Sequence, residues 1–419
     1  MKRTFIPLRF VLVFSTFLLT ILLYIDRACI SAAKGDICSD LGFSMTDFGW
    51  IMAIFTLGYA LFQTPAGKLA DNKGARGVIA GIVAVWSLLT SLTGAAWSYT
   101  SMLTIRFLFG AGEAGAFPAL SKVVYNWFPI KERGIIQGIN FSGSRIGAAF
   151  AMPLVAWLIK EIGWRHTFLA FGAIGVLYSL LWYRLFRDKP ENTKFIGSEE
   201  VAFIQKNRQQ PSVGSKVGLP FNTIIESATM WKTMVQYICS NFTFYFSLTW
   251  MYPYIQERFH LGLVEAGFYT SIPLIGGAVG NWLAGILVDA IYRRGKWKLS
   301  RSMPAIIGFS LSAIGMIMFT LVSSPELSVA FMTLAVFGAD MTLSPSWAFC
   351  IDVGKENVGA VSGTMNMAGN LGAFVTIIAF PYLFKWTGHY EPFFLICAGL
   401  SLVAIIMWST MNPEKAINN

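Results

Sequence analysis

Four charged residues stand inside otherwise apolar stretches of the sequence. Asp26 and Arg27 are adjacent in LLYIDRACISA (22–32), and Arg106 and Glu113 are seven positions apart in RFLFGAGE. Seven residues are close to two helical turns, so Arg106 and Glu113 are expected on one face of a helix. Adjacent residues are about 100° apart, so Arg27 is expected to face a central cavity while Asp26 turns toward a neighbouring helix. Charged residues within long apolar helices usually pair with one another and mark the path of a transported solute. A purely structural ion pair is the alternative.

The composition explains why charge is costly at these positions. Of the 419 residues, 55% are hydrophobic and 13% are charged, whereas a soluble protein carries about 25% charged residues. Apolar stretches of about 20 residues, each long enough to cross a hydrocarbon core as a helix, recur along the chain. Asp26 and Arg27 occupy the place of a signal-peptide cleavage site, so the first stretch is expected to be retained. The sequence therefore predicts an all-α membrane protein with twelve transmembrane helices, at 10–32, 47–69, 77–97, 100–124, 134–159, 165–186, 231–254, 265–290, 302–323, 326–351, 357–384 and 390–411.

The distribution of basic residues predicts how the chain lies in the membrane. On this topology, 24 of the 32 Lys and Arg residues fall on the side that holds both termini. Because cytoplasmic loops carry an excess of Lys and Arg, the bias predicts cytoplasmic N- and C-termini. The same bias accounts for the net charge of +10, so the expected partner is the lipid bilayer and not a nucleic acid. The five cysteines show neither metal-ligand nor disulfide spacing.

The chain divides into two similar halves. GKLADNKGAR and GILVDAIYRR put Asp71 opposite Asp289, and two glycine-rich segments align so that Arg145 falls opposite Asn370. Several such matches in the same order indicate a duplicated six-helix unit. Internal repeats of this kind mark secondary transporters, whose substrate site lies near the membrane midplane between the repeats. We expect an N-terminal six-helix bundle, a cytoplasmic linker and a C-terminal six-helix bundle, at 1–186, 187–230 and 231–419.

The segment around Asp71 resembles the loop signature of the major facilitator superfamily, with Gly, an acidic residue four positions on, then Gly and a basic residue. The Arg106…Glu113 pair, YIDR in the first span and GYALFQTPAG (58–67) look like the anion:cation symporter family. That family includes bacterial permeases for galactonate, glucarate and hexuronates, and the sialin and vesicular glutamate carriers of vertebrates. The resemblance implies a monomeric secondary active transporter of a bacterial inner membrane. It implies proton-coupled symport of an organic anion, such as a sugar acid or a related carboxylate, by alternating access.

The resemblance also implies roles for individual residues. Asp26 and Glu113 would carry protons. Arg27 and Arg106 would link proton and substrate, and Tyr59 would contribute a hydroxyl group to the site. A conformational latch would hold the cytoplasmic side closed and release it on inward opening, and we expect it to consist of Asp71, Arg76 and Asp289.

Arg145 is a feature of this sequence, since a neutral residue is usual at its place in the sugar-acid permeases that the chain resembles. Two interpretations stay open. Arg145 binds a second anionic group of the substrate, because a guanidinium grips carboxylates in a bidentate fork, or it neutralises a buried acid such as Asp340 or Glu113. Asp340 stands at the repeat position of Glu113 and is a weaker candidate for a proton site. From the second half, the substrate site is expected to include Asn370, Ser346 and Trp347.

Other functions fit the sequence less well. An anion uniporter or anion exchanger of the same fold would use the arginines without coupling through the acids. An enzyme is not expected, because the three histidines lie near the outer ends of the spans and the sequence has no GxxxxGK[ST] phosphate loop. No cofactor or metal is expected, and protons would be the coupling ion.

Overall fold

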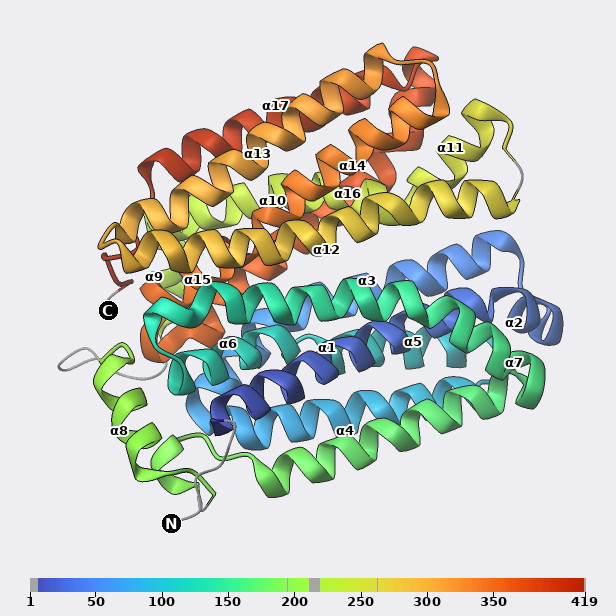
Figure 1. Cartoon of the computed structure of the whole chain (residues 1–419). Helices are drawn as coiled ribbons and strands as arrows, with labels where there is room; N and C mark the ends of the chain where they lie inside the picture. Colours follow the sequence, from blue (N-terminus) through green and yellow to red (C-terminus); the bar gives the residue numbers. More distant parts are fainter. Residues whose placement is uncertain (1–6, 194, 211–218, 262, 418–419) are drawn as a thin grey trace.

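The computed structural model describes residues 7–193, 195–210, 219–261 and 263–417, and within these ranges every regular element is a helix (Figure 1). The first half contains α1 (Leu8–Ala32), α2 (Lys34–Leu41), α3 (Met45–Lys73), α4 (Ala75–Gly94), α5 (Tyr99–Glu113), α6 (Ala116–Trp127), η1 (Ile130–Glu132) and α7 (Arg133–Leu185). The connecting segment contains η2 (Pro190–Asn192), α8 (Ser198–Asn207) and α9 (Phe221–Glu226). The second half contains α10 (Ala228–Thr249), α11 (Met251–Phe259), α12 (Leu263–Arg293), α13 (Trp297–Leu321), α14 (Pro325–Met341), α15 (Leu343–Gly354), η3 (Lys355–Asn357), α16 (Val358–Thr387) and α17 (Glu391–Thr410).

The helices follow the expected spans, with differences at four places. The fourth, seventh and tenth spans are each broken into two helices, α5–α6, α10–α11 and α14–α15. The fifth and sixth spans run together as α7, which bends at Gly163 with φ 77° and ψ 159°. Only glycine readily adopts this backbone conformation, so a residue with a side chain would strain the bend.

Length and composition alone identify fewer membrane-crossing segments than the twelve expected spans. Within the described residues, seven helical stretches are long and apolar enough, at Leu8–Ala32, Ala75–Gly94, Leu154–Leu185, Glu265–Arg293, Trp297–Leu321, Pro325–Thr387 and Glu391–Thr410. The expected spans outside this set include α3, with its polar GKLADNK end, and the broken pair α5–α6, which carries Arg106 and Glu113. Both α3 and the pair α5–α6 carry polar side chains that lie in the interior.

The duplication is visible in the helix boundaries. α6 and α15 begin and end at positions offset by 227 residues, and η1 and η3 precede α7 and α16 at an offset of 225. The fourth and tenth spans are interrupted at nearly the same point of the repeat, since α5 ends at Glu113 and α14 ends at Met341, one residue past Asp340. The two halves therefore share a local backbone design.

The two halves lie against each other along their length (Figure 1). We call the end that carries both termini and α8 the linker end, and the end that carries α2 and α11 the far end. Across the halves, α3 packs on α16 and α7 packs on α12. At the linker end these contacts are backbone to backbone. A Cβ atom on Gly67 would lie 2.0 Å from the Gly359 carbonyl oxygen, and one on Gly285 would lie 2.7 Å from that of Gly134.

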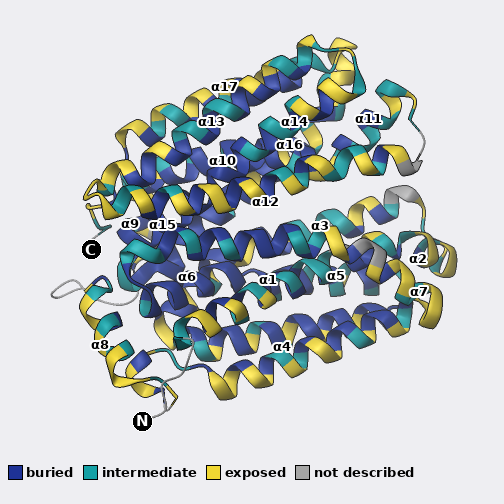
Figure 2. Cartoon of the chain, viewed as in Figure 1, coloured by how far each residue is buried: buried dark blue, intermediate teal, exposed yellow. Residues whose placement is uncertain are grey.

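Burial follows the arrangement expected of a protein in lipid. Figure 2 shows exposed residues along the outward faces of α4, α13 and α17, and mainly buried residues along α6, α10 and α15. The outward faces are apolar, with exposed side chains such as Leu88, Ile314 and Leu402. Many buried side chains are polar, among them Asp26, Arg106, Glu113, Arg145 and Asp340. Apolar side chains therefore face outward, and charged side chains lie in the interior.

Candidate functional site

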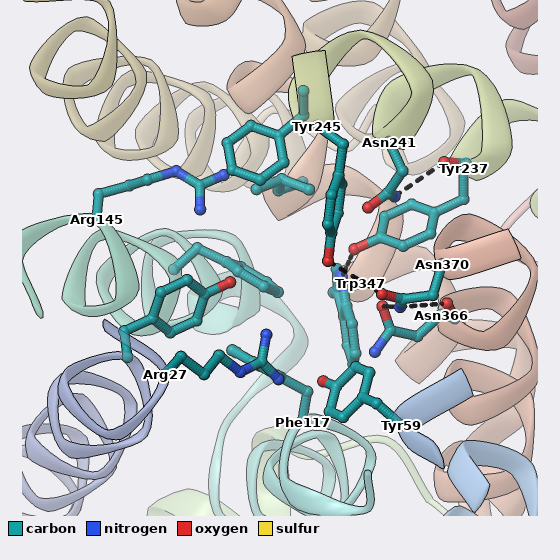
Figure 3. Close-up of a pocket in the computed structure, with 14 residues that line it drawn as sticks. Arg27, Tyr59, Phe117, Arg145, Tyr237, Asn241, Tyr245, Trp347, Asn366 and Asn370 are labelled. Atoms are coloured by element: carbon teal, nitrogen blue, oxygen red, sulfur yellow. Dashed lines mark hydrogen bonds between the residues drawn. The ribbon is translucent and has the colours of Figure 1, made fainter. Parts of the chain in front are cut away.

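A cavity lies between the two halves (Figure 3). The first half contributes side chains from α1, α3, α6 and α7, and the second half contributes side chains from α10, α15 and α16. Its lining residues are Tyr24, Arg27, Tyr59, Phe117, Phe141, Arg145, Tyr237, Asn241, Phe244, Tyr245, Leu343, Trp347, Asn366 and Asn370.

The lining is divided by chemistry. In Figure 3, Arg27 and Arg145 lie on one side of the cavity, and Tyr237, Asn241, Asn366 and Asn370 lie opposite. Guanidinium groups bind anions, and amide and hydroxyl groups exchange hydrogen bonds with sugar hydroxyls. The cavity is therefore suited to a small molecule that is anionic at one side and hydroxylated along its length.

Arg27 joins the cavity to a buried acid. Its Nε donates a hydrogen bond to Glu113 Oε1 at 2.8 Å, and its guanidinium carbon lies 4.4 Å from the centre of the Tyr59 ring. Glu113 is 1% exposed, and its other carboxylate oxygen has no hydrogen-bond partner among the described residues. The arginine thus stands between the cavity and an acid that is satisfied mainly through this arginine.

Asp26 points away from the cavity and is 1% exposed. Neither of its carboxylate oxygens makes a hydrogen bond to a described residue, and Trp86 of α4, Glu113 and Arg106 lie in its surroundings. An ionised carboxylate at this place has no hydrogen bond to offset the cost of burial, which is large for a charged group.

Arg106 does not line the cavity. Its guanidinium carbon lies 4.9 Å from the ring centre of Phe55 and 4.7 Å from that of Phe109, and its Nε has no hydrogen-bond partner among the described residues. Asp26, Arg27 and Glu113 all act on it electrostatically. The structure therefore gathers the four charged residues of the opening motifs into one cluster, of which only Arg27 reaches the cavity.

Arg145 lines the cavity and is paired with Asp340 of α14. Its Nε donates to Asp340 Oδ2 at 2.8 Å, and its Nη2 donates to Oδ1 at 2.6 Å. The guanidinium also stacks on Phe244, with its carbon 3.9 Å from the ring centre. Of the two interpretations of Arg145, this geometry corresponds to the neutralised acid, and the partner is Asp340 and not Glu113.

The expected residues of the second half divide between the cavity and the core. Asn370 accepts a hydrogen bond from the Tyr245 hydroxyl at 3.1 Å, and Trp347 Nε1 donates to the Tyr237 hydroxyl at 2.9 Å, so both lie on the cavity. Ser346 does not line the cavity. Its hydroxyl points into the core and donates to the Thr342 carbonyl oxygen one turn earlier in the helix. Adjacent residues on α15 point in different directions, and Trp347 takes the cavity face.

Asp71 bridges the two halves at the linker end. Its carboxylate accepts hydrogen bonds from the backbone N–H groups of Gly359 at 2.8 Å and Ala360 at 2.7 Å, in the first turn of α16. Lys122 Nζ lies 3.6 Å from the same carboxylate and also donates to the carbonyl oxygen of Glu356. A carboxylate at a helix N-terminus satisfies orphan donors and complements the helix dipole.

Asp289 makes the equivalent bridge in the opposite sense. Its carboxylate accepts from the backbone N–H groups of Gly134 and Ile135, both at 2.9 Å, in the first turn of α7. Arg76, expected in the same latch, bonds within the first half instead, where its Nε donates to the Tyr183 carbonyl oxygen.

A third bridge at the linker end lies outside the sequence predictions. Asp352 is fully buried and accepts hydrogen bonds from Arg133 Nη1 at 2.6 Å, from Arg301 Nε at 2.7 Å and from Trp297 Nε1 at 2.9 Å. The linker residue Gln209 accepts from Arg133 at 2.7 Å. An acid at the end of an apolar span, as Asp352 is, was the signal that could have identified this cluster. The cavity residues Tyr24, Tyr237 and Tyr245 gave no such signal, because aromatic residues are common throughout the spans.

A duplicated helical membrane protein with a charged cavity between its halves is the architecture of a secondary transporter. Residues 16–377 match the Major Facilitator Superfamily, and the chain belongs to this superfamily. It is a multi-pass membrane transporter, not an enzyme, with the twelve-helix fold of that superfamily.

Curated relatives include anion-type permeases, as the resemblance implied. The probable sulfoacetate transporter SauU of Cupriavidus necator is 29% identical over 397 residues, which cover 94% of this chain and 92% of that protein. The probable galactarate/D-glucarate transporter GudP of Escherichia coli K12 is 29% identical over 427 residues, covering 97% and 93%. The hexuronate transporter of Bacillus subtilis is 29% identical over 392 residues, covering 93% and 91%.

Solved structures share the fold. The proton:xylose symporter XylE superimposes with a TM-score of 0.78 at 17% identity, covering 97% of this chain and 98% of that one. The transporter FucP, in an outward conformation, superimposes with a TM-score of 0.71 at 14% identity, covering 96% and 98%.

Proposed function

We propose that the protein is a proton-coupled symporter that imports an organic anion by alternating access. The observation that carries the proposal is the 2.8 Å hydrogen bond from Arg27 to Glu113. Arg27 lines the cavity, and Glu113 is buried on the side of Arg27 away from the cavity. An anion that enters the cavity competes with Glu113 for the guanidinium. Once displaced, the Glu113 carboxylate would be buried without a partner, which is costly, and uptake of a proton removes that cost.

Asp26 is the second proton carrier in this proposal. It is buried beside the Arg27–Glu113 pair without a hydrogen bond of its own among the described residues. Arg106 interacts electrostatically with both acids, so the protonation of one acid affects the protonation of the other. With two protons for one monoanion, the membrane potential contributes roughly 2.3 kcal/mol per 100 mV, whereas one proton for one monoanion moves no net charge.

The substrate class is a sugar acid or a related small carboxylate or sulfonate. The relatives at 29% identity are named for galactarate and D-glucarate, hexuronate and sulfoacetate, all of them small organic anions. The arginine side of the cavity suits the anionic group, and the amides of Asn366 and Asn370 suit hydroxyl groups.

The linker end faces the cytoplasm of a bacterial cell in this proposal, in keeping with its excess of basic residues. Asp71 and Asp289 act as the latch that closes this end, so the substrate enters from the far end. Reorientation breaks their bonds to the helix N-termini. A side-chain cap on a helix N-terminus is worth about 1 kcal/mol, which suits a contact that opens in every cycle.

The proposal is tested in proteoliposomes that contain the full chain. External pH is recorded as galactarate, D-glucarate, a hexuronate or sulfoacetate is added, with the parent, Glu113→Gln and the exposed control Asp40→Asn. We expect alkalinisation outside with the parent and the control, and none with Glu113→Gln. Anion uptake without proton movement in the parent would instead support a uniporter or an exchanger.

A further inference from the structure

Two acid–arginine pairs flank the cavity, and only one of them belongs to the mechanism above. In the first pair, Arg27 is held by Glu113; in the second, Arg145 is held by Asp340 through two hydrogen bonds of 2.8 and 2.6 Å. In each pair the arginine lines the cavity, and the acid is 1% exposed and lies outside the lining.

The two acids are related by the duplication. Asp340 stands at the repeat position of Glu113; α5 ends at Glu113, and α14 ends one residue past Asp340. The two arginines, in contrast, are not repeat partners, since Arg145 falls opposite Asn370. Asp340, in the second half, is thus paired with an arginine of α7 in the first half that has no equivalent in the repeat.

Among the described residues, Asp340 is the acid that pairs with Arg145, and Arg27 is the other charged side chain on the same side of the cavity. α12 approaches Asp340 with Gly277, where a Cβ would lie 2.1 Å from Oδ2, and α13 faces α14 with Gly308 and Gly315. The titratable groups near Arg145 are the Tyr24 and Tyr245 hydroxyls, from α1 and α10. Arg145 and Asp340 therefore neutralise each other, and an anion that binds Arg145 frees the Asp340 carboxylate.

We propose that the Arg145–Asp340 pair is a second anion-exchange site, where a second anionic group of the substrate displaces Asp340 from Arg145 and Asp340 takes up a proton. The proton comes from the aqueous phase that reaches the cavity; Arg145 stays protonated and exchanges one carboxylate for another anionic group. The favoured substrate is then a dianion, such as a dicarboxylate of a sugar or a sulfonated carboxylate. This inference rests on the proposed function and extends it by one anionic group and one proton.

Matched pairs of acids test the inference. D-glucarate and D-gluconate share a six-carbon chain and differ in one terminal carboxylate, and sulfoacetate and acetate differ in one sulfonate. Binding of each to the purified full chain gives a dianion-to-monoanion affinity ratio. The parent is expected to favour the dianions, and the charge-neutral double variant Arg145→Gln/Asp340→Asn is expected to lower the ratio by about tenfold or more, the effect of one charge-assisted hydrogen-bonded contact.

Two further variants separate binding from structure. Arg145→Lys keeps the charge and loses the fork, so its ratio is expected to lie between those of the parent and the double variant. Asp340→Asn is expected to bind D-glucarate with one proton fewer than the parent, measured by calorimetry in buffers of different ionisation enthalpy. The exposed pair Arg165–Asp40, with side chains 38% and 47% exposed, provides the control double variant Arg165→Gln/Asp40→Asn.

An affinity ratio that stays within about twofold of the parent in Arg145→Gln/Asp340→Asn, or an unchanged proton count in Asp340→Asn, would show a purely structural pair and overturn the inference. A parent that binds the monoanions as tightly as the dianions would also overturn it. A parent that binds none of the four acids contradicts the proposed function itself, which keeps the two failures distinct.

Discussion

Asp71 and Asp289 occupy equivalent positions in the two halves, and each carboxylate caps the first turn of a helix in the other half. Asp71 accepts from two backbone N–H groups of α16 at 2.8 and 2.7 Å, and Asp289 accepts from two of α7 at 2.9 Å each. Two equivalent helix caps thus join the two halves at the linker end.

Weakening either cap should open the linker end. Asp71→Asn and Asp289→Asn each remove the charge and one of the two accepted hydrogen bonds, a loss of about 1 kcal/mol. That loss corresponds to about a fivefold shift toward the conformation open at this end. Spin labels at the exposed positions 72 and 298, one on each half, should report a larger population of long distances. Equal distance distributions in the variants and the parent would contradict the latch.

The glycine contact beside Asp71 allows a steric version of the same experiment. A Cβ on Gly67 would lie 2.0 Å from the Gly359 carbonyl oxygen, and a backbone atom cannot give way as a side chain can. Gly67→Ala should therefore separate α3 from α16 and lower transport strongly. Gly77→Ala is the matched control, because a Cβ there meets no atom within 4 Å. If both variants transport at the parental rate, close packing at this end is not required.

The buried Asp352 cluster should determine stability. Asp352→Asn removes the carboxylate that pairs with the guanidinium groups of both Arg133 and Arg301, although both arginines are fully buried. Removing one member of a buried ion pair costs about 3–5 kcal/mol. We expect a clearly lower temperature of thermal unfolding in detergent, compared with the exposed control Asp40→Asn. A melting temperature equal to that of the parent would mean that the cluster adds no net stability.

Arg27 should control anion affinity. Arg27→Gln removes a charged donor worth about 1.5–3 kcal/mol in its hydrogen bonds, so the affinity for D-glucarate should fall by roughly 10- to 100-fold. Arg27→Lys should fall between, because an ammonium keeps the charge without the planar fork. Arg165→Gln, on the exposed Arg165–Asp40 pair, is the control. Parental affinity in Arg27→Gln would exclude this residue from the substrate site.

The sequence predicted the helical fold and the membrane class because both follow from long apolar stretches. It also indicated the duplication, since equivalent glycines and acids recur at nearly constant offsets. The breaks after Glu113 and before Leu343 were not predicted, because a single turn of altered backbone leaves the apolar pattern unchanged.

For residues far apart in the sequence, the sequence could limit the possible side-chain partners to a few but could not identify the actual one. Arg145 was left between a substrate role and two acids, and its actual partner is 195 positions away on another helix. Periodicity states which residues share a face, not which face meets another helix. For the same reason, two residues expected to bind the substrate do not line the cavity. Arg106 is buried within the first half, and Ser346 lies in the core of the second half.

The central claim is that the substrate and Glu113 compete for Arg27 and that the displaced acid takes up a proton. Calorimetric binding of D-glucarate to the purified protein, in buffers of different ionisation enthalpy, counts the protons taken up with the anion. The account predicts net uptake by the parent and one proton fewer in Glu113→Gln, with the count unchanged in the control Asp40→Asn. The same proton count in Glu113→Gln as in the parent would contradict it.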